Sequence, residues 1–381
     1  MTALRDDLQR IVAEDKDHGP FVSIFMPLDP DADSMKDNTA QFNDLLAQAK
    51  KQFDDLFPTK EWNAYDQRLR MIGEHITMDY AQSRGLAIIA GDKDVYQYYL
   101  ATHVDPLAVV SNNLYILPII DATEFQPNYN ILQIDRDSFR MFNVEDGLIS
   151  EKPMPTGAPV SAKKALGDEV IGGDEKIRMH EHGRYSEYRG YDVKDESEQA
   201  DERNYFEVVD EYVTKHVSLR DHLPVVLMAV SEDEGEFRKI SHNPYLSKDL
   251  VISKVPPIFN HKTLEDATDK INQEMIKIAQ SDIADQIDTA KSAKKFVGET
   301  QDVINATIEG RVATLIIAKG AKLAGSIAIN ATVDTTSATA KQNNLLNDLA
   351  ATTMSYGGRV YIVDPAQLDG QPVIALLKGN H

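Results

Sequence analysis

The sequence contains no cysteine and a single tryptophan among its 381 residues. The absence of cysteine excludes disulfide bonds, thiolate zinc sites and cysteine nucleophiles. Long apolar runs are also missing, because the longest ones, such as residues 225–230 and 313–318, have the length of a strand and not of a membrane span. The charged N-terminus lacks the apolar segment of a signal peptide. These absences favour a protein of the reducing cytoplasm.

Positive charge is scarce as well. The chain has 61 acidic against 40 basic residues, which gives a formal net charge of −21. A charge of this sign and size argues against broad electrostatic binding to DNA or to anionic membranes. A net charge of this sign does not exclude binding to a structured RNA through a local basic patch. We therefore expect neither a DNA nor a membrane partner.

Apolar periodicity divides the chain into three parts. Residues 42–57 carry an amphipathic helical stripe, and residues 85–90 and 95–100 read as a strand hairpin. Further along come three short strands, an apolar run at 223–230 typical of a strand buried on both faces, and a last part in which helices alternate with apolar strands. The predicted fold class is α/β (α+β) with three domains: an N-terminal α/β domain at 1–122, a middle domain at 123–262 and a C-terminal α/β sandwich at 263–381.

One stretch, residues 167–201, has almost no apolar periodicity, and we call it the arm. It is too long for an ordinary connection, and loops of this length are usually functional or disordered. Its first half is basic with interleaved tyrosines, its second half is acidic, and a helix is predicted only from Asn204 onward. Basic and aromatic side chains are the types that bind phosphates and stack on bases. The predicted RNA-binding residues are Lys176, Arg178, His180, His182, Arg184, Tyr185, Tyr188, Arg189 and Tyr191. The alternative is a solvated loop whose tyrosines pack locally.

Other candidate sites are weaker. His180 and His182 are spaced like the start of a metal site, but no third ligand is evident, which favours a surface pair. Asp135, Asp137 and Glu145 suggest an acidic metal cluster, although turn chemistry accounts for the first two. Glycine-rich signatures of nucleotide binding are absent. The sequence therefore predicts no metal, no cofactor and no catalytic residue.

The C-terminal part carries a resemblance. The segments FVGETQDVINATIEGRVATLIIAKG and NNLLNDLAATTMSYGGRVYIVDPAQLDGQPVIALL resemble the C-terminal domain of archaeo-eukaryotic peptide-chain release factors and Pelota, and VSIFMPLDP resembles the N-terminal domain of bacterial members. The order and lengths of the three parts agree, so the chain resembles a bacterial paralogue family of this superfamily. The resemblance implies an RNase H-like middle domain and a C-terminal fold similar to kink-turn-binding ribosomal proteins. It also implies entry into the ribosomal A site, where hydrolytic members place a Gly-Gly-Gln tip.

That tip is missing. The only glycine pair in the arm is Gly172-Gly173, which is followed by Asp174 and lies too early. An acidic side chain near a developing oxyanion is unfavourable. The favoured hypothesis is therefore a ribosome-associated factor that does not hydrolyse peptidyl-tRNA and acts in rescue, stress or hibernation. Its partners would be the ribosome, through ribosomal RNA or the tRNA site, and a protein bound by the C-terminal domain. Two alternatives stay open: a peptidyl-tRNA hydrolase with a variant tip, and a protein-interaction module that has left translation.

Overall fold

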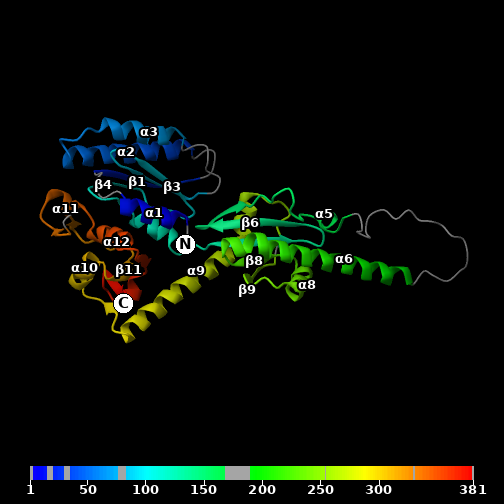
Figure 1. Cartoon of the computed structure of the whole chain (residues 1–381). Helices are drawn as coiled ribbons and strands as arrows, with labels where there is room; N and C mark the ends of the chain where they lie inside the picture. Colours follow the sequence, from blue (N-terminus) through cyan, green and yellow to red (C-terminus); the bar gives the residue numbers. More distant parts are fainter. Residues whose placement is uncertain are drawn as a thin grey trace, which may run out of the picture. The chain divides into compact units, whose positions relative to one another are not determined.

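The computed structural model describes residues 3–14, 20–29, 35–75, 83–167, 189–253, 255–328 and 331–379. The chain forms two compact units (Figure 1). Unit 1 comprises Met1–Gln126, Asp146–Leu148 and Glu274–His381, and unit 2 comprises Pro127–Glu145 and Ile149–Gln273. Helices and sheets occur in both units, which confirms the predicted mixed α/β class. None of the described helices is both long and apolar enough to cross a membrane. The predicted three-domain boundaries stay a prediction.

The first sheet of unit 1 has the strand order β3-β2-β1-β4, and it is antiparallel throughout. Side chains alternate along β1, so that Ile24 joins the core under α2 and α3 whereas Phe25 joins the core on the opposite face. The sheet is therefore buried on both faces. Its elements are α1 (Ala3–Glu14), β1 (Phe21–Pro27), α2 (Met35–Leu56), α3 (Asn63–His75), β2 (Gly85–Ala90), β3 (Val95–Leu100), β4 (Leu107–Ser111) and α4 (Leu117–Thr123).

The second sheet of unit 1 has the order β10-β15-β11-β14 and lies between helices. Leu315 of β11 packs with α10 and α12, whereas its neighbour Ile316 packs with the end of α9. This confirms the predicted α/β sandwich. Its elements are the part of α9 (His261–Ser292) from Glu274 onward, β10 (Phe296–Val297), α10 (Thr300–Ile308), β11 (Val312–Ala318), β12 (Ser326–Ile327), β13 (Val333–Asp334), α11 (Ala338–Gln342), α12 (Leu345–Ser355), β14 (Arg359–Val363), the 3₁₀ turn η5 (Pro365–Leu368) and β15 (Val373–Leu377).

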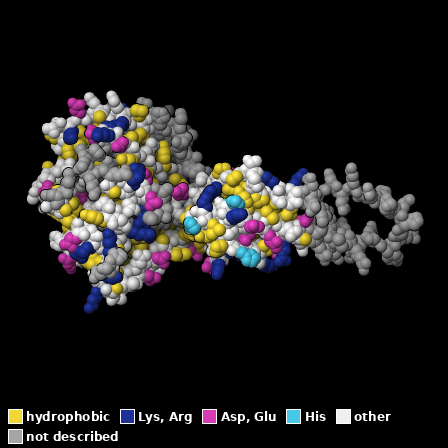
Figure 2. Space-filling view, viewed as in Figure 1, with side chains coloured by type: hydrophobic (Ala, Val, Ile, Leu, Met, Phe, Trp, Pro, Cys, Tyr) yellow, Lys and Arg dark blue, Asp and Glu magenta, His cyan; other side chains and the backbone are white. Residues whose placement is uncertain are grey.

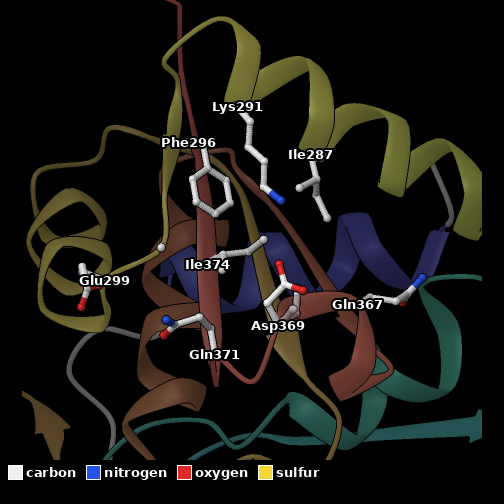
Figure 3. A pocket seen from close by; sticks show the side chains of 10 residues that line it. Ile287, Lys291, Phe296, Glu299, Gln367, Asp369, Gln371 and Ile374 are labelled. Carbon is white, nitrogen blue, oxygen red and sulfur yellow. The ribbon is translucent and has the colours of Figure 1, made fainter.

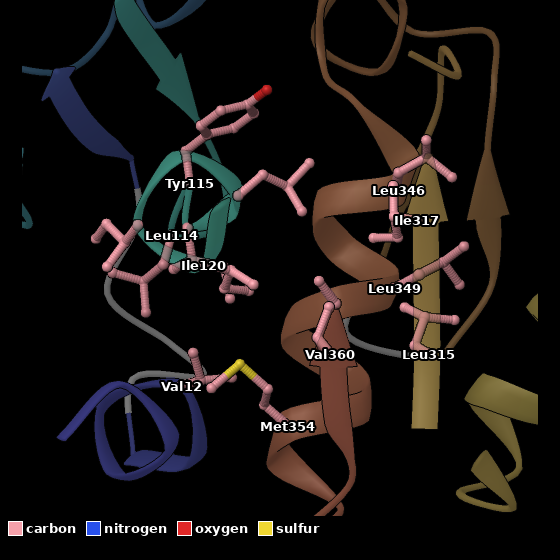
Figure 4. Packing of buried hydrophobic residues seen from close by; sticks show 14 of the residues in the cluster. Val12, Leu114, Tyr115, Ile120, Leu315, Ile317, Leu346, Leu349, Met354 and Val360 are labelled. Atoms are coloured by element: carbon pink, nitrogen blue, oxygen red, sulfur yellow. The ribbon is translucent and has the colours of Figure 1, made fainter. Parts of the chain in front are cut away.

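The two ends of the chain share one core within unit 1 (Figure 4). Val12 and Ile120 from the N-terminal part belong to the same buried cluster as Leu349 and Val360 from the C-terminal part. The fully buried Asn347 of α12 joins the parts by hydrogen bonds. Its Oδ1 accepts from the N–H of Ile116 and its Nδ2 donates to the carbonyl of Leu114, both at 2.8 Å. A buried amide with both ends paired fixes the register of the two parts.

Unit 2 is built on a five-stranded sheet of order β7-β6-β5-β8-β9. β5, β6 and β7 form the predicted antiparallel meander, while β8 and β9 run parallel to β5. This mixed sheet agrees with the expected RNase H-like middle domain. Its elements are β5 (Tyr129–Ile134), β6 (Phe139–Glu145), β7 (Leu148–Glu151), α5 (Ala162–Leu166), α6 (Arg189–Val213), the π-helical turn η4 (Thr214–Ser218), α7 (Leu219–Asp221), β8 (Val225–Met228), α8 (Ser231–Ile240) and β9 (Leu246–Ile252).

Candidate functional site

Most of the predicted RNA-binding residues lie outside the described part of the chain. These are Lys176, Arg178, His180, His182, Arg184, Tyr185 and Tyr188. Arg189 and Tyr191 belong to the first turn of α6, and the described part does not include their side chains. RNA binding by the arm therefore stays a prediction.

Helix α6 corrects the expected structure of the acidic half of the arm. The sequence predicts a helix only from Asn204, yet α6 begins at Arg189 and contains the whole acidic run up to Glu202. Glu, Gln, Lys and Ala are good helix formers even without an apolar face. Acidic side chains near a helix N-terminus also interact favourably with the helix dipole. The interpretation of residues 189–201 as a loop is therefore wrong.

The other end of the arm is held by the turn between β5 and β6. The N–H of Asp135 donates to the carbonyl of Ser138 at 2.9 Å and closes this turn. The N–H of Ala162, the first residue of α5, donates to the carbonyl of Asp137 at 2.8 Å. The hydroxyl of Ser161 caps α5 by accepting from the N–H of Lys164. The β5–β6 turn therefore fixes the start of the short helix that leads to Gly167.

Arg136 projects from the same turn into a group of carboxylates. Its Nη2 lies 2.8 Å from Glu232 Oε2, and its Nε lies 3.6 Å from Asp233 Oδ1 and 3.8 Å from Glu202 Oε2. Glu232 and Asp233 lie in the first turn of α8, while Glu202 lies in α6. We call these four residues the Arg136 cluster. It joins the β5–β6 turn, α6 and α8 at the carboxyl end of the parallel strands.

Burial governs the electrostatics of the Arg136 cluster. The side chains of Asp233 and Glu202 are only 5% and 14% exposed, whereas that of Arg136 is 60% exposed. Burial raises the pKa of Glu202, the charge of Asp233 adds to the rise, and Arg136 opposes it. Burial likewise raises the pKa of Asp233, again against the attraction of Arg136. The guanidinium is therefore the cation that opposes the rise in the pKa of two largely buried carboxyls.

The acidic metal cluster expected as one alternative is not assembled. Asp135 and Asp137 flank Arg136 at one end of the sheet, but Glu145 ends β6 at the other end, where Val144 pairs with Tyr129. Within the described ranges, no group of three or more His, Asp or Glu residues is arranged to hold a metal ion. The hypothesis that these three carboxylates bind a metal is therefore wrong.

The far end of α6 is tied to the far end of α8. Asp210, which is 7% exposed, accepts hydrogen bonds from the hydroxyl of Ser241 and, at 2.8 Å, from the N–H of His242. Beside this anchor lies a hollow of about 520 Å³, lined by both helices and by the π-helical turn. Its charged rim mixes signs, since Lys215 and Lys239 lie with Glu207 and Glu211. The hollow therefore has no single-sign character that would select a nucleic acid.

Charges of both signs are interspersed over the visible surface (Figure 2). A second hollow, of about 340 Å³, lies in unit 1 between the end of α9, β10 and β15 (Figure 3). There the ammonium of Lys291 lies 5.3 Å from the ring centroid of Phe296, and Glu299 and Asp369 add negative charge. This hollow presents mixed charge around an apolar floor, which suits a protein segment better than a polyanion.

The sequence reasoning missed Arg136, Glu202, Glu232 and Asp233. Turn chemistry accounts for Asp135, Arg136 and Asp137 in the sequence, and nothing there gives Arg136 a role beyond the turn. A cation at the carboxyl end of a central strand is a weak signal by itself. The partners come from α6 and α8, and nothing in the spacing of these residues shows that they meet.

Comparison with protein families finds a match that covers unit 2. Residues 127–274 match the model of bacterial archaeo-eukaryotic release factor family 6. The match confirms the predicted resemblance for this part of the chain, and its bounds nearly coincide with those of unit 2. No curated protein matches the chain.

Solved structures of translation factors are similar to the chain at low identity. The archaeal translation termination factor aRF1 is 13% identical, with 98% of each chain covered and a TM-score of 0.24. Pelota from Archaeoglobus fulgidus is 11% identical, covering 77% of this chain and 80% of that one, with a TM-score of 0.34. A ribosome-bound archaeal Pelota, in a model with ABCE1, is 10% identical, covering 75% and 72%, with a TM-score of 0.40.

Proposed function

We propose that this protein is a ribosome-associated translation factor that acts in the cytoplasm without hydrolysing peptidyl-tRNA. The observation that carries the proposal is the match of residues 127–274 to a release-factor family in a chain that contains no Gly-Gly-Gln. The role would be rescue, stress response or hibernation. The basic half of the arm would contact ribosomal RNA or the tRNA site, and the C-terminal sandwich would take a protein partner.

The chemistry of the two glycine pairs supports a non-hydrolytic role. Gly172-Gly173 precedes an aspartate, whose charge would oppose the oxyanion formed during ester hydrolysis. The other pair, Gly357-Gly358, ends α12. There the two N–H groups donate to the carbonyls of Met354 and Thr353, and a Cβ on Gly358 would lie 2.5 Å from the Thr353 side chain. This second pair is explained by close packing at a helix end.

The first experiment measures binding of the purified protein to purified ribosomes by co-sedimentation at several salt concentrations. We expect binding that weakens as salt rises, because phosphate contacts release counterions. The variant K176E/R178E/R184E should reduce binding at least tenfold at low salt, because each substitution removes about one phosphate contact. The matched control K51E/K60E/K93E makes the same change in charge at exposed positions in the N-terminal part of unit 1 and should bind as the wild type does.

The second experiment separates the proposal from its alternatives. Labelled peptide on stalled ribosomes should stay attached to tRNA in the presence of the protein. Release by the wild type that is lost in the arm variant would instead support a hydrolase with a variant tip. Failure to bind ribosomes from either growing or starved cells would reject the proposal and favour an interaction module outside translation.

A further inference from the structure

Helices α6 and α8 run in parallel and meet at three successive levels. Glu202, Phe206 and Asp210 recur every four residues on α6, and Asp233, Phe237 and Ser241 recur at the same spacing along α8 and its cap. Positions four residues apart lie on one face of a helix. We call these three levels the α6–α8 ladder.

The three levels of the α6–α8 ladder differ in chemistry. In the middle, the rings of Phe206 and Phe237 pack edge to face with centroids 5.6 Å apart, and both are fully buried. At the far end, Asp210 accepts hydrogen bonds from Ser241 and from the backbone beyond it. Neither of these levels uses a charged side chain from a third element. Each therefore holds α6 by packing or by neutral donors.

The level nearest the arm is different because it joins two carboxylates. Burial raises the pKa of both carboxyls, the charge of Asp233 raises the pKa of Glu202 further, and Arg136 opposes the rise in both groups. Two largely buried like charges stay together only when a cation lies between them. Arg136 supplies that cation from the β5–β6 turn. This level therefore depends on a cation from a third element, which the other two levels do not use.

The same turn holds the other side of the arm. Its Asp137 carbonyl accepts from the first N–H of α5, which leads to Gly167, whereas its Arg136 side chain reaches α6, which begins at Arg189. One short turn thus contacts both elements that border the arm. Both elements are therefore tied to the same four residues, 135–138, in addition to the hydrogen bond from the Tyr205 hydroxyl to the carbonyl of Pro159.

We infer that Arg136 is a positioning residue that fixes the arm end of α6 against α8 and the β5–β6 turn, and that binding to the ribosome depends on it. The second part rests on the proposed function, and the first part does not. Arg136 itself is not assigned a contact with the ribosome. It acts through Glu202 and Asp233, and so through the direction in which α6 leaves the sheet.

If Arg136 acts through its charge, its loss should have a pH-dependent effect on α6, whereas loss of packing alone should not. The groups that face Glu202 and Asp233 are Arg136 and Asp135 from the turn, and Glu232 and Glu236 from α8. Without Arg136, the two carboxyls must either stay charged and uncompensated or take up protons. Protons are scarce at pH 8 and more available at pH 5. Removing the guanidinium should therefore destabilise the arm end of α6 more at pH 8 than at pH 5, whereas loss of packing alone would destabilise it equally at both pH values.

The experiment compares amide hydrogen exchange of residues 198–206 in the wild type, R136Q, R136K and the control R140Q. Arg140 lies on β6 of the same unit, is half exposed and lies outside the Arg136 cluster. R136Q should speed exchange in this segment about fivefold at pH 8, the scale of a lost partly exposed ion pair, and less at pH 5. R140Q should match the wild type. Since variants are compared at the same pH, the intrinsic pH dependence of exchange cancels.

R136K should restore exchange to within about twofold of the wild type, because an ammonium keeps the charge but loses the fork of the guanidinium. Equal exchange in R136Q and the wild type, an equal effect at both pH values, or exchange in R136K as fast as in R136Q would each overturn the positioning role.

Ribosome co-sedimentation tests whether ribosome binding depends on Arg136. Weaker binding by R136Q with unchanged binding by R140Q supports the inference, and equal binding overturns its second part. Absence of binding even by the wild type rejects the proposed function, while the exchange result still decides whether Arg136 positions α6.

Discussion

Glu124 shows at the scale of a residue how burial overrides an ion pair. Its Oε1 lies 3.4 Å from Arg5 Nη1, and its side chain is 11% exposed at the end of α4. Burial raises its pKa from 4.5 to about 7, although Arg5 and Arg359 oppose the rise and Asp146 adds to it. A carboxylate at a helix C-terminus also faces the negative end of the helix dipole. Near neutral pH this group is therefore partly protonated.

We expect Glu124 to make unit 1 less stable as pH rises from 5 to 8. The folded state binds the proton more tightly than the unfolded state, so the free energy of unfolding falls across the window between the two pKa values. A shift of this size corresponds to at most about 3 kcal/mol. Glu124→Gln removes the titration, so the variant should gain stability relative to the wild type as pH rises. Urea unfolding at pH 5 and pH 8, followed by Trp62 fluorescence, measures the difference.

Glu274→Gln is the control for this comparison, because Glu274 belongs to unit 1 and is exposed. Its effect on the free energy of unfolding should be within about 0.5 kcal/mol at both pH values. A Glu124→Gln variant whose stability relative to the wild type is the same at pH 5 and pH 8 would contradict the expected titration.

At the scale of elements, the sequence predicts the helices and strands whose apolar residues recur at regular spacing, and it misses those without such a pattern. The meander β5–β7, the buried strand β8 and the amphipathic helix α2 were all predictable from alternation or helical spacing. The first half of α6 was not, because its residues favour a helix without an apolar face. Its attachment depends on Glu202 meeting Arg136, a contact between distant parts of the sequence. The Arg136 cluster was unpredictable for the same reason, since spacing along the chain does not record tertiary contacts.

The helical state of the acidic half can be tested at Ala200, which is exposed on α6. Ala200→Gly should cost about 1 kcal/mol and Ala200→Pro about 3 kcal/mol of local stability, because glycine and proline disfavour a helix interior. Amide exchange of residues 199–204 should therefore rise about fivefold for glycine and more for proline. The Trp62 unfolding midpoint of unit 1 should stay unchanged and serves as the internal control. Equal exchange in the wild type and both variants would mean that this stretch is not helical in solution.

At the scale of the whole molecule, unit 1 joins the two ends of the sequence into one core. The first sheet has one face under α2 and α3, and its other face contributes to the cluster that contains α12 and β11. Asn347 pairs with backbone groups on both sides of Tyr115. Periodicity can identify each part, but it cannot show that their apolar faces cover each other. Shared burial of this kind predicts that the two ends of the chain unfold together.

The single tryptophan makes this prediction measurable. Trp62 is 8% exposed and lies in the N-terminal part, packed against Phe53 and Tyr65. Leu349 is fully buried in α12, at the other end of the sequence. Leu349→Ala should destabilise the shared core by about 2–5 kcal/mol. We therefore expect the urea midpoint reported by Trp62 fluorescence to fall, although the substitution lies far from Trp62 along the chain.

Leu227→Ala is the matched control, because Leu227 is equally buried but belongs to the core of unit 2. It should lower the stability of unit 2, measured by amide exchange in β5 and β8, and leave the Trp62 midpoint in place. If Leu349→Ala also leaves that midpoint in place while exchange in β11 and β14 accelerates, the two ends of the chain unfold separately. The N-terminal and C-terminal parts would then be independent domains in contact, and the cooperative unit would be smaller than the shared core.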